Sequence, residues 1–239
     1  MRHWRPFLWM FLFIIPGLAW AASLPMELTA PAGGEMDLKS NTMQYYGTDT
    51  QPVTVHWENS VLEAKYLEYN RNQEIAIGKQ AVQLVQTNPA RTMHCDEITV
   101  ELKKNHMVAV GNIGLKYDEN TSFTGERLEW DRANDFVLMT GKPVLHYKEW
   151  QLSGDRMEGQ VTRGTLTVTG SAQIQGNDAT ARAGKMLFNR DQNKVVLQQN
   201  PIVVRGNSEL TAAEIVYDLT TKKISANGGV QSRITNESH

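Results

Sequence analysis

The chain has 239 residues, with 24 Lys and Arg, 26 Asp and Glu and a formal net charge of −2 at pH 7. This near-neutral balance gives no support for a nucleic-acid partner. The length suits one large all-β domain or two smaller domains.

The first 21 residues have the pattern of a secretory signal peptide. A basic segment precedes the apolar run 7–18, and Ala19-Trp20-Ala21 is a small-x-small cleavage site. As a membrane anchor, the stretch 7–22 is short and contains a Pro-Gly pair, whereas a spanning helix needs about 20 residues. We therefore predict cleavage after residue 21 and a single mature domain over residues 22–239.

A nine-residue pattern recurs along the rest of the chain. Its clearest copy is LTAAEIVYD, residues 210–218, with apolar residues at offsets 0, +5 and +7 and a small residue at +2. The other copies begin at Leu62, Met93, Phe123, Leu152 and Ala181, at successive spacings of 31, 30, 29, 29 and 29 residues. A fixed period of this length is typical of a repeat architecture.

The repeat explains the one cysteine of the chain. Cys95 lies in the segment MHCDE, beside a histidine and two acids, where a Cys-His nucleophile could be suspected. Its offset is +2, where the sister units have alanine or glycine (Ala64, Gly125, Gly154, Ala183 and Ala212). A buried thiol packs as a small hydrophobe, and a lone cysteine cannot form an internal disulfide. We therefore expect a buried, structural Cys95.

The apolar offsets also predict local geometry. Offsets 0 and +2 alternate as in a strand, but the parity changes before +5 and +7, which indicates a bulge or bend. A turn rich in Asn, Asp, Lys and Arg follows each copy, and then a second apolar stretch, so antiparallel hairpins and few helices are expected. Four units have glycine at +18 (Gly111, Gly141, Gly170 and Gly228), the Ala181 unit has Gln199 there, and Gly78 comes two positions early in the Leu62 unit. Glycine within a strand indicates a bend or close backbone approach.

The segment 35–57 reads as a degenerate leading unit, in which Leu38, Met43 and Tyr45 take offsets 0, +5 and +7. Terminal repeats are commonly atypical because they cap the array.

The pattern A-x-x-I-x-Y-D-x-x-x-x-x-I-x-A-x-G-G-V over residues 212–230, together with its degenerate copies, resembles the OstA-like family. The resemblance implies an all-β fold: a twisted antiparallel β-jellyroll of about six strand-turn-strand repeats of 29–31 residues, with an open groove. It also implies a periplasmic carrier that shields the lipid A acyl chains of lipopolysaccharide and needs no cofactor. The implied partners are an inner-membrane anchored companion, an outer-membrane translocon, and further copies joined end to end through edge strands after Met26 and near 224–234.

For lipid contact we select the apolar columns at +5 and +7. They are Leu67, Tyr69, Ile98, Val100, Leu128, Trp130, Met186, Phe188, Ile215 and Tyr217. The alternative is that these side chains pack an ordinary closed core, since any β-sandwich needs an inward face. Basic residues in the turns could meet anionic sugar or phosphate groups, although solvated charges are the preferred interpretation; these residues are Arg71, Arg132, Arg190, Lys222 and Lys223.

Sequence motifs for catalysis are missing. The histidines have no metal-ligand spacing, and neither an H-E-x-x-H nor a G-x-S-x-G motif nor a phosphate-binding glycine loop occurs. We therefore expect no metal and no enzyme activity. Two other classes stay open: a secreted parallel β-helix that binds or cleaves polysaccharide, and a structural or adhesive surface array.

Overall fold

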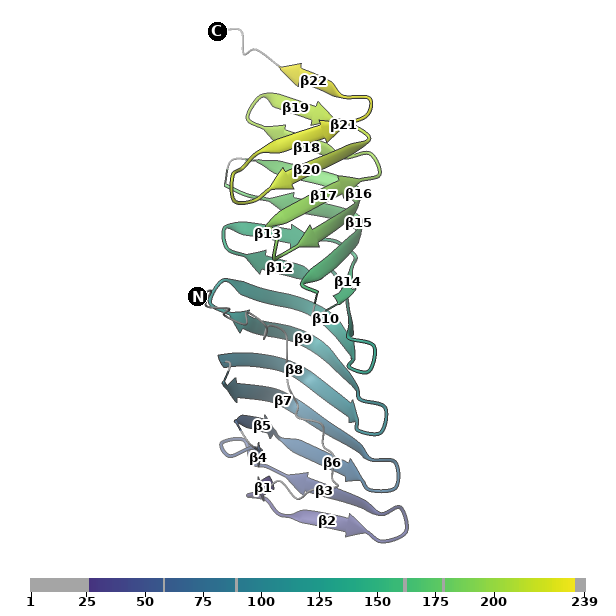
Figure 1. The fold of residues 1–239 in the computed structure, drawn as a ribbon. Coiled ribbons are helices and arrows are strands. Elements are labelled where there is room, and N and C mark those ends of the chain that lie inside the picture. Colours follow the sequence, from purple (N-terminus) through teal and green to yellow (C-terminus); the bar gives the residue numbers. More distant parts are fainter. Residues whose placement is uncertain (1–25, 58, 89, 161–162, 178, 235–239) are drawn as a thin grey trace, which may run out of the picture.

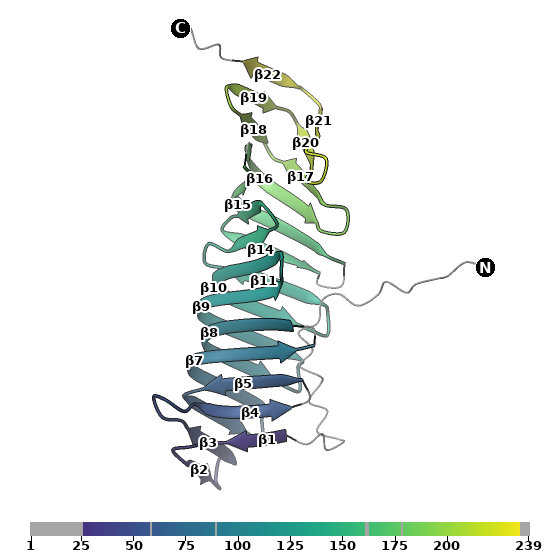
Figure 2. The same ribbon diagram turned by 90° about the vertical axis from the view of Figure 1, so that its left-hand side faces the viewer.

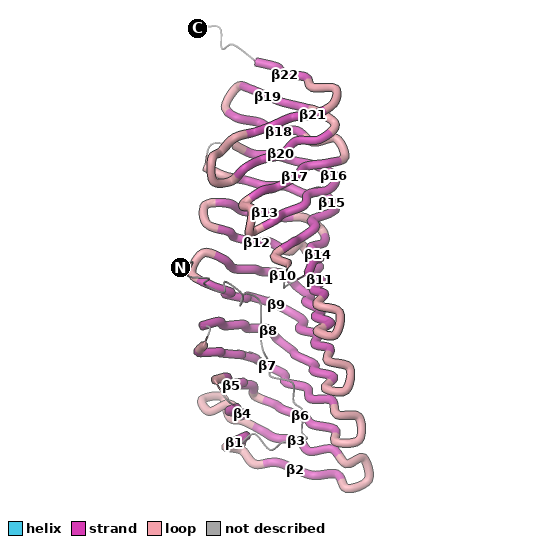
Figure 3. Tube along the Cα trace, viewed as in Figure 1, coloured by secondary structure: helices cyan, strands magenta, loops and turns pink. Residues whose placement is uncertain are grey.

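A computed structural model of the chain describes residues 26–57, 59–88, 90–160, 163–177 and 179–234. These residues form twenty-two strands joined into one sheet, and no helix (Figure 3). Every described strand pairing is antiparallel, for example β10 with β11 and β15 with β16. The predicted all-β, antiparallel fold is confirmed, and the parallel β-helix alternative is wrong. The predicted signal peptide lies outside the described residues.

The strands form two hydrogen-bonded ladders. In spatial order, the first ladder contains β1 (Met26–Thr29), β4 (Val53–Trp57), β5 (Ser60–Ala64), β7 (Ile75–Thr87), β8 (Ala90–Glu101), β9 (His106–Asp118), β10 (Thr121–Asp131), β12 (Val144–Tyr147), β13 (Trp150–Ser153), β15 (Thr165–Gln175), β16 (Thr180–Asn189), β18 (Ile202–Arg205), β19 (Ser208–Thr211) and β22 (Gln231–Ile234). The second contains β2 (Gly34–Asp37), β3 (Thr42–Tyr46), β6 (Tyr66–Asn70), β7, β8, β9, β10, β11 (Phe136–Thr140), β14 (Arg156–Gln160), β15, β16, β17 (Lys194–Gln198), β20 (Glu214–Asp218) and β21 (Ile224–Asn227).

Six long strands, β7 to β10, β15 and β16, belong to both ladders and bend where they pass from one to the other. At this corner the register shifts between His94 and Glu97 in β8 and between Gly125 and Arg127 in β10. These shifts fall between offsets +1 and +4, so the bulge predicted from the change of parity is confirmed.

The corner has a recurring backbone conformation at offset +18. All six residues there have positive φ, between 63° and 79°: Gln80, Gly111, Gly141, Gly170, Gln199 and Gly228. The next residue of each unit also has positive φ, as in Ala81 and Asn112. Glycine is favoured at +18 because it adopts this conformation without steric cost. The corner of the Leu62 unit is therefore at Gln80, and Gly78 is an ordinary strand residue that pairs with Leu67 and Ile98.

The structure also explains why Gln199 replaces glycine in one unit. A Cβ added at Gly141 would lie 2.8 Å from Cγ of Glu126, the +3 residue on the neighbouring strand. In the Ala181 unit the two residues are exchanged, because +3 is Gly184 and a Cβ there would lie 2.7 Å from Oε1 of Gln199. In these two units only one of the two positions carries a long side chain, whereas the Leu62 unit carries Lys65 and Gln80 at both.

The predicted register of the leading unit is wrong. In each later unit the hairpin turn has a positive-φ residue at +12, such as Glu74 and Asn105, and Asn41 takes this place in the leader. Met43 and Tyr45 therefore lie in the second strand of their unit, β3, and Leu38 is an 81% exposed turn residue. The first strand, β2, is exposed at all four positions, so its residues show none of the apolar alternation from which a strand is recognised.

The molecule is elongated, with β1 and β2 at one end and β22 at the other (Figures 1 and 2). Among the strands described, β1 pairs only with β4, β2 with β3, β21 with β20, and β22 with β19. The expected edge strands are confirmed. Neighbouring strands lie about 4.8 Å apart, so each ladder, from its first edge strand to its last, is about 60 Å long.

Candidate lipid-binding groove

The apolar columns selected from the sequence face the space between the two ladders. They lie on β6, β8, β10, β16 and β20 of the second ladder. Eight are buried, and Tyr69 and Val100 are half-buried. The buried ones are Leu67, Ile98, Leu128, Trp130, Met186, Phe188, Ile215 and Tyr217. The ten positions therefore share one face, and all but Leu67, Tyr69 and Val100 belong to a single apolar cluster that extends from Ala64 to Leu219.

The first ladder supplies the opposite wall, which we did not select from the sequence. Its inward residues include the column at +22, where Leu84, Leu145, Ile174 and Val203 are buried and Leu115 is half-buried. The signal was present in the alternating runs VQLV, PVLHY, AQIQ and PIVV. Alternation shows that a strand has one buried face, but it does not show that this face opposes the +5 and +7 columns.

An apolar cavity of about 90 Å³ lies between the ladders in the middle of the molecule. Leu128, Trp130 and Phe188 line it from the second ladder, and Leu115 and Leu145 line it from the first. Tyr117, Thr121 and Arg190 add polar groups to its boundary. Ligand pockets for drug-sized molecules have volumes of about 300–1,000 Å³, so this cavity is smaller than a typical ligand pocket.

The ladders also meet on the side away from the corner, which we call the seam. There the hydroxyl of Tyr147, at the end of β12, donates a hydrogen bond to Oδ1 of Asn193 in the turn after β16. Lys148 Nζ donates to the same oxygen at 2.9 Å. The ring of Tyr147 packs edge-on against Phe188, with 5.2 Å between centroids. At this point the two ladders are therefore joined by polar contacts with Asn193 and by an aromatic contact with Phe188.

Cys95 is 4% exposed, as expected. Burial, reinforced by the charges of Asp96 and Glu97, raises the pKa of its thiol to about 12. A thiolate is the reactive form of cysteine, so at neutral pH this residue packs as an apolar side chain.

One of the turn cations is not solvated as expected. Arg190 is 7% exposed, and its guanidinium carbon lies 5.9 Å from the ring centroid of Tyr117. Arg132 is half-buried over Trp130 at 5.5 Å, whereas Arg71, Lys222 and Lys223 are exposed. The offset of Arg190, +9, continues the inward parity of +5 and +7, and Leu219 is buried at the same offset in the next unit.

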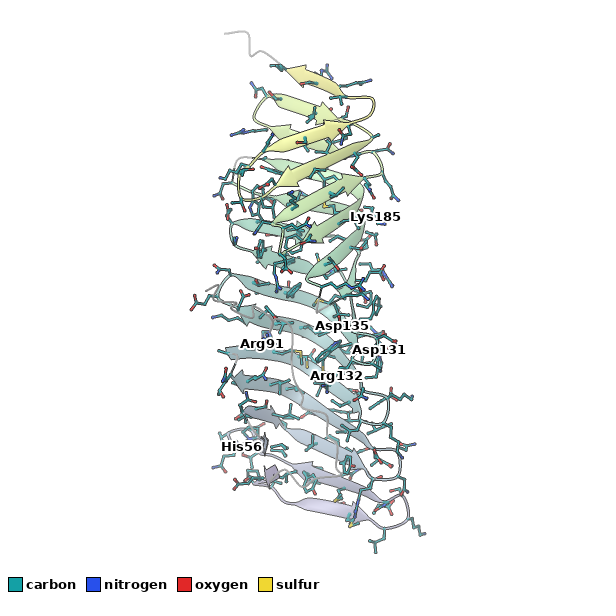
Figure 4. The ribbon with its side chains drawn as sticks, in the orientation of Figure 1. His56, Arg91, Asp131, Arg132, Asp135 and Lys185 are labelled. Atoms are coloured by element: carbon teal, nitrogen blue, oxygen red, sulfur yellow. The ribbon has the colours of Figure 1, made fainter. Side chains whose placement is uncertain are left out.

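A further arginine, which we did not select from the sequence, lies on the first ladder. Arg91 of β8 is 5% exposed, donates a hydrogen bond from Nη2 to the hydroxyl of Tyr117 at 2.8 Å, and lies 4.3 Å from the centroid of that ring. Its sequence signal is parity, because Arg91, Met93 and Cys95 alternate on one face of the strand. Figure 4 labels Arg91 and Arg132 in the middle of the stack.

In the described ranges, no three His, Cys, Asp or Glu side chains gather as ligands for a metal ion. None of the described residues forms a helix with the length and hydrophobicity needed to cross a bilayer.

These features define an elongated antiparallel β-protein whose two ladders enclose an apolar interior. The sequence model of the family described as LptA/(LptD N-terminal domain) LPS transport protein matches residues 61–165 and 159–223, so the chain belongs to this family.

Among the solved structures, the chain is similar to LptH of Pseudomonas aeruginosa, described as the LptA homologous periplasmic component of the conserved lipopolysaccharide transport device. The two share 17% identity with a TM-score of 0.45, over 48% of this chain and 95% of that one. No curated protein matches the chain.

Proposed function

We propose that this protein is a non-enzymatic periplasmic carrier, secreted by a signal peptide over residues 1–21, with residues 22–239 as one domain. Its cargo is lipopolysaccharide, and the acyl chains lie between the two ladders. The observation that carries the proposal is the apolar cluster continuous from Ala64 to Leu219, combined with membership in a lipopolysaccharide-transport family.

The energy of lipid transfer supports an apolar path. Exposing an acyl chain to water costs about 0.8 kcal/mol per CH₂, so a chain of about 14 carbons costs about 11 kcal/mol. Side chains such as Met186 and Phe188 on one ladder and Leu145 on the other offset this cost by replacing water around the chain. Because the cavity holds only about 90 Å³, we infer that the ladders separate at the seam when an acyl chain enters.

The two ends of the molecule support end-to-end assembly. An edge strand presents unpaired N–H and C=O groups to which another strand can add. Glu27 on β1 and Glu35 on β2 are exposed at one end, and Arg233 on β22 is exposed at the other with Lys222 and Lys223 in a nearby turn. Apolar side chains are also exposed at both ends, since Met36 is 48% and Ile234 is 70% exposed. Opposite charges at the two ends favour head-to-tail contacts, either between copies or with an inner-membrane anchored companion and an outer-membrane translocon.

Photo-crosslinking in the native envelope tests the carrier role. A photoreactive residue at Phe188, which is 3% exposed and inward, is compared with one at Leu187, the next residue of β16, which faces the other side of the strand. We expect lipopolysaccharide adducts at Phe188 and not at Leu187. Folded protein without adducts at Phe188, Ile215 and Leu128 would refute the proposal.

A further inference from the structure

The interior is not apolar throughout, because a row of buried polar side chains borders it along the seam. The row crosses neighbouring strands of the first ladder: Ser60 pairs with Gln86, Gln86 with Arg91, and Thr121 with Tyr147. Tyr117 accepts the hydrogen bond from Arg91 and directly precedes Asp118, the residue of β9 that pairs with Thr121. All six are at most 6% exposed.

The row follows the repeat. Ser60, Arg91 and Thr121 occupy offset −2, the next inward position before the apolar residue at 0, and Trp150 and Ala179 take this place in later units. Gln86, Tyr117 and Tyr147 occupy +24 on the partner strands. The described buried polar or charged residues are Thr42, Ser60, Gln86, Arg91, Thr121 and Arg190, and all but Thr42 belong either to this row or to the arginines at +9 of the second ladder.

The second ladder brings arginines to the same border. Arg71, Arg132 and Arg190 occupy offset +9, directly after the inward residue at +7, in alternate units. They range from exposed Arg71 through half-buried Arg132 to buried Arg190. Burial lowers the pKa of Arg132.

The two ladders converge on Tyr117, with the guanidinium of Arg91 at 4.3 Å and that of Arg190 at 5.9 Å from its ring centroid. The pKa of Arg91 is lowered, mainly by burial of its guanidinium and further by the charge of Arg190. Tyr117 and Asp118 act in the opposite direction and raise this pKa. Arg190 forms an ion pair with Asp191 at 3.3 Å, in which the Asp191 side chain is 64% exposed. Two cations close together in a low-dielectric site repel each other, and an anion between them relieves the repulsion.

Hydrogen-bonding capacity is available beside the two arginines. The buried Oγ1 of Thr121 and Oε1 of Gln86 make no hydrogen bond within the described part of the chain. A hydroxyl can donate and accept, and an amide oxygen accepts, so the row can bind a group that carries both phosphate oxygens and sugar hydroxyls.

We infer that Arg91, Tyr117 and Arg190, with Thr121 and Gln86, form a binding site for the phosphorylated sugar headgroup of the lipid whose acyl chains occupy the apolar interior. The inference rests on the proposed carrier function. It assigns the two halves of an amphiphile to two parts of one groove. Acyl chains contact the +5 and +7 columns, and phosphate lies at the seam, where charge-assisted hydrogen bonds from arginine are strong and directional.

The test measures binding of three probes to the mature chain: phosphorylated lipid A, the same lipid with its phosphates removed, and inorganic phosphate. We expect the wild type to bind phosphorylated lipid A at least tenfold more tightly than the dephosphorylated form. The variant Arg91→Gln/Arg190→Gln should lose at least tenfold in affinity for the phosphorylated form and less than threefold for the other. Arg182→Gln is the control, because Arg182 is exposed on β16 and should affect neither lipid.

Three outcomes would overturn the inference: equal wild-type affinity for the two lipids, equal losses for both lipids in the double variant, or inorganic phosphate binding as tightly as the phosphorylated lipid, which would identify a free-anion site. The first comparison uses only wild-type protein, so it decides the question even where the double variant does not fold. Failure to bind either lipid would instead refute the carrier function itself.

Discussion

The exchanged pair at the corner allows a double-mutant test of how this fold is specified. Glu126 faces Gly141 across the corner, whereas Gly184 faces Gln199 at the equivalent place. We predict that Gly141→Gln destabilises the protein and that Glu126→Gly rescues most of the packing cost by recreating the Gly184–Gln199 arrangement.

The magnitude follows from two effects at Gly141. Its φ is +79°, and a side chain in the left-handed region costs about 1–2 kcal/mol. The clash with Glu126 adds about 1–3 kcal/mol, as for overpacking elsewhere. Gly141→Gln should therefore cost about 2–5 kcal/mol. Glu126→Gly alone costs about 0.5–1 kcal/mol through backbone entropy, and the double variant should cost about 1.5–3 kcal/mol, so the coupling favours the pair by about 1–3 kcal/mol.

Urea unfolding followed by far-ultraviolet circular dichroism measures the four free energies of unfolding. Gly206→Gln is the control for backbone strain alone, because Gly206 has φ +53° and no atom lies within 4 Å of a Cβ added there; about 1–2 kcal/mol is expected. Single costs that add to within about 0.5 kcal/mol in the double variant would show that the two sites are independent and that the steric argument is wrong.

Three further predictions concern the core, the thiol and the ends. Met186 is fully buried, so Met186→Ala should cost about 2–5 kcal/mol in the free energy of unfolding, and a loss below about 1 kcal/mol would contradict a packed interior at this point. The folded Cys95 thiol has a pKa of about 12 against an ordinary value of 9.0, so the unfolded chain loses this proton at lower pH than the folded chain. Between about pH 9 and 12 the free energy of unfolding should therefore fall, by up to about 1.4 kcal/mol per pH unit more than in Cys95→Ala. Equal pH dependence of the two proteins would contradict this prediction. Glu27→Lys/Glu35→Lys should weaken self-association in sedimentation experiments at low salt, and Arg233→Glu in a mixed partner should restore it, whereas unchanged association of the first variant would remove electrostatics from the end-to-end contact.

The inward columns could be predicted from the sequence because they depend on local geometry. A period of two with one change of parity places Leu67, Ile98 and Met186 on one face wherever the partner strands lie. The predicted register of the leading unit was wrong because this reasoning depends on alternation. β2 is an exposed edge strand without alternation, so the more regular β3 was taken for the first strand of the unit. The glycine at +18 was recognised as a bend, but Gln80 and Gln199 at the same offset were not, because glutamine does not signal the positive φ that the backbone has there.

Arg91 and Arg190 could not be brought together from the sequence, because they contact Tyr117 from different ladders and different units. An arginine at a strand end is usually a solvated charge, and only its offset within the repeat distinguishes Arg190 from Lys222. Extending the inward parity of the repeat from offset 0 back to −2, and from +7 on to +9, would have placed both arginines inward. It would not have shown that the seam brings them to the same ring.

The buried residues of the interior change from apolar on the corner side to polar and charged on the seam side. At the corner, the residues at +18 and +19 are left-handed and the buried residues at +2 are small and apolar, such as Ala64 and Cys95. At the seam, the buried residues change to Arg91, Thr121 and Arg190. Buried charged groups need partners, and here Arg190 is paired with Asp191 and Arg91 donates to the hydroxyl of Tyr117. This order fits the carrier function and the headgroup site that we propose, in which the acyl chains would reach the apolar floor and the headgroup would stay beside the arginines at the border.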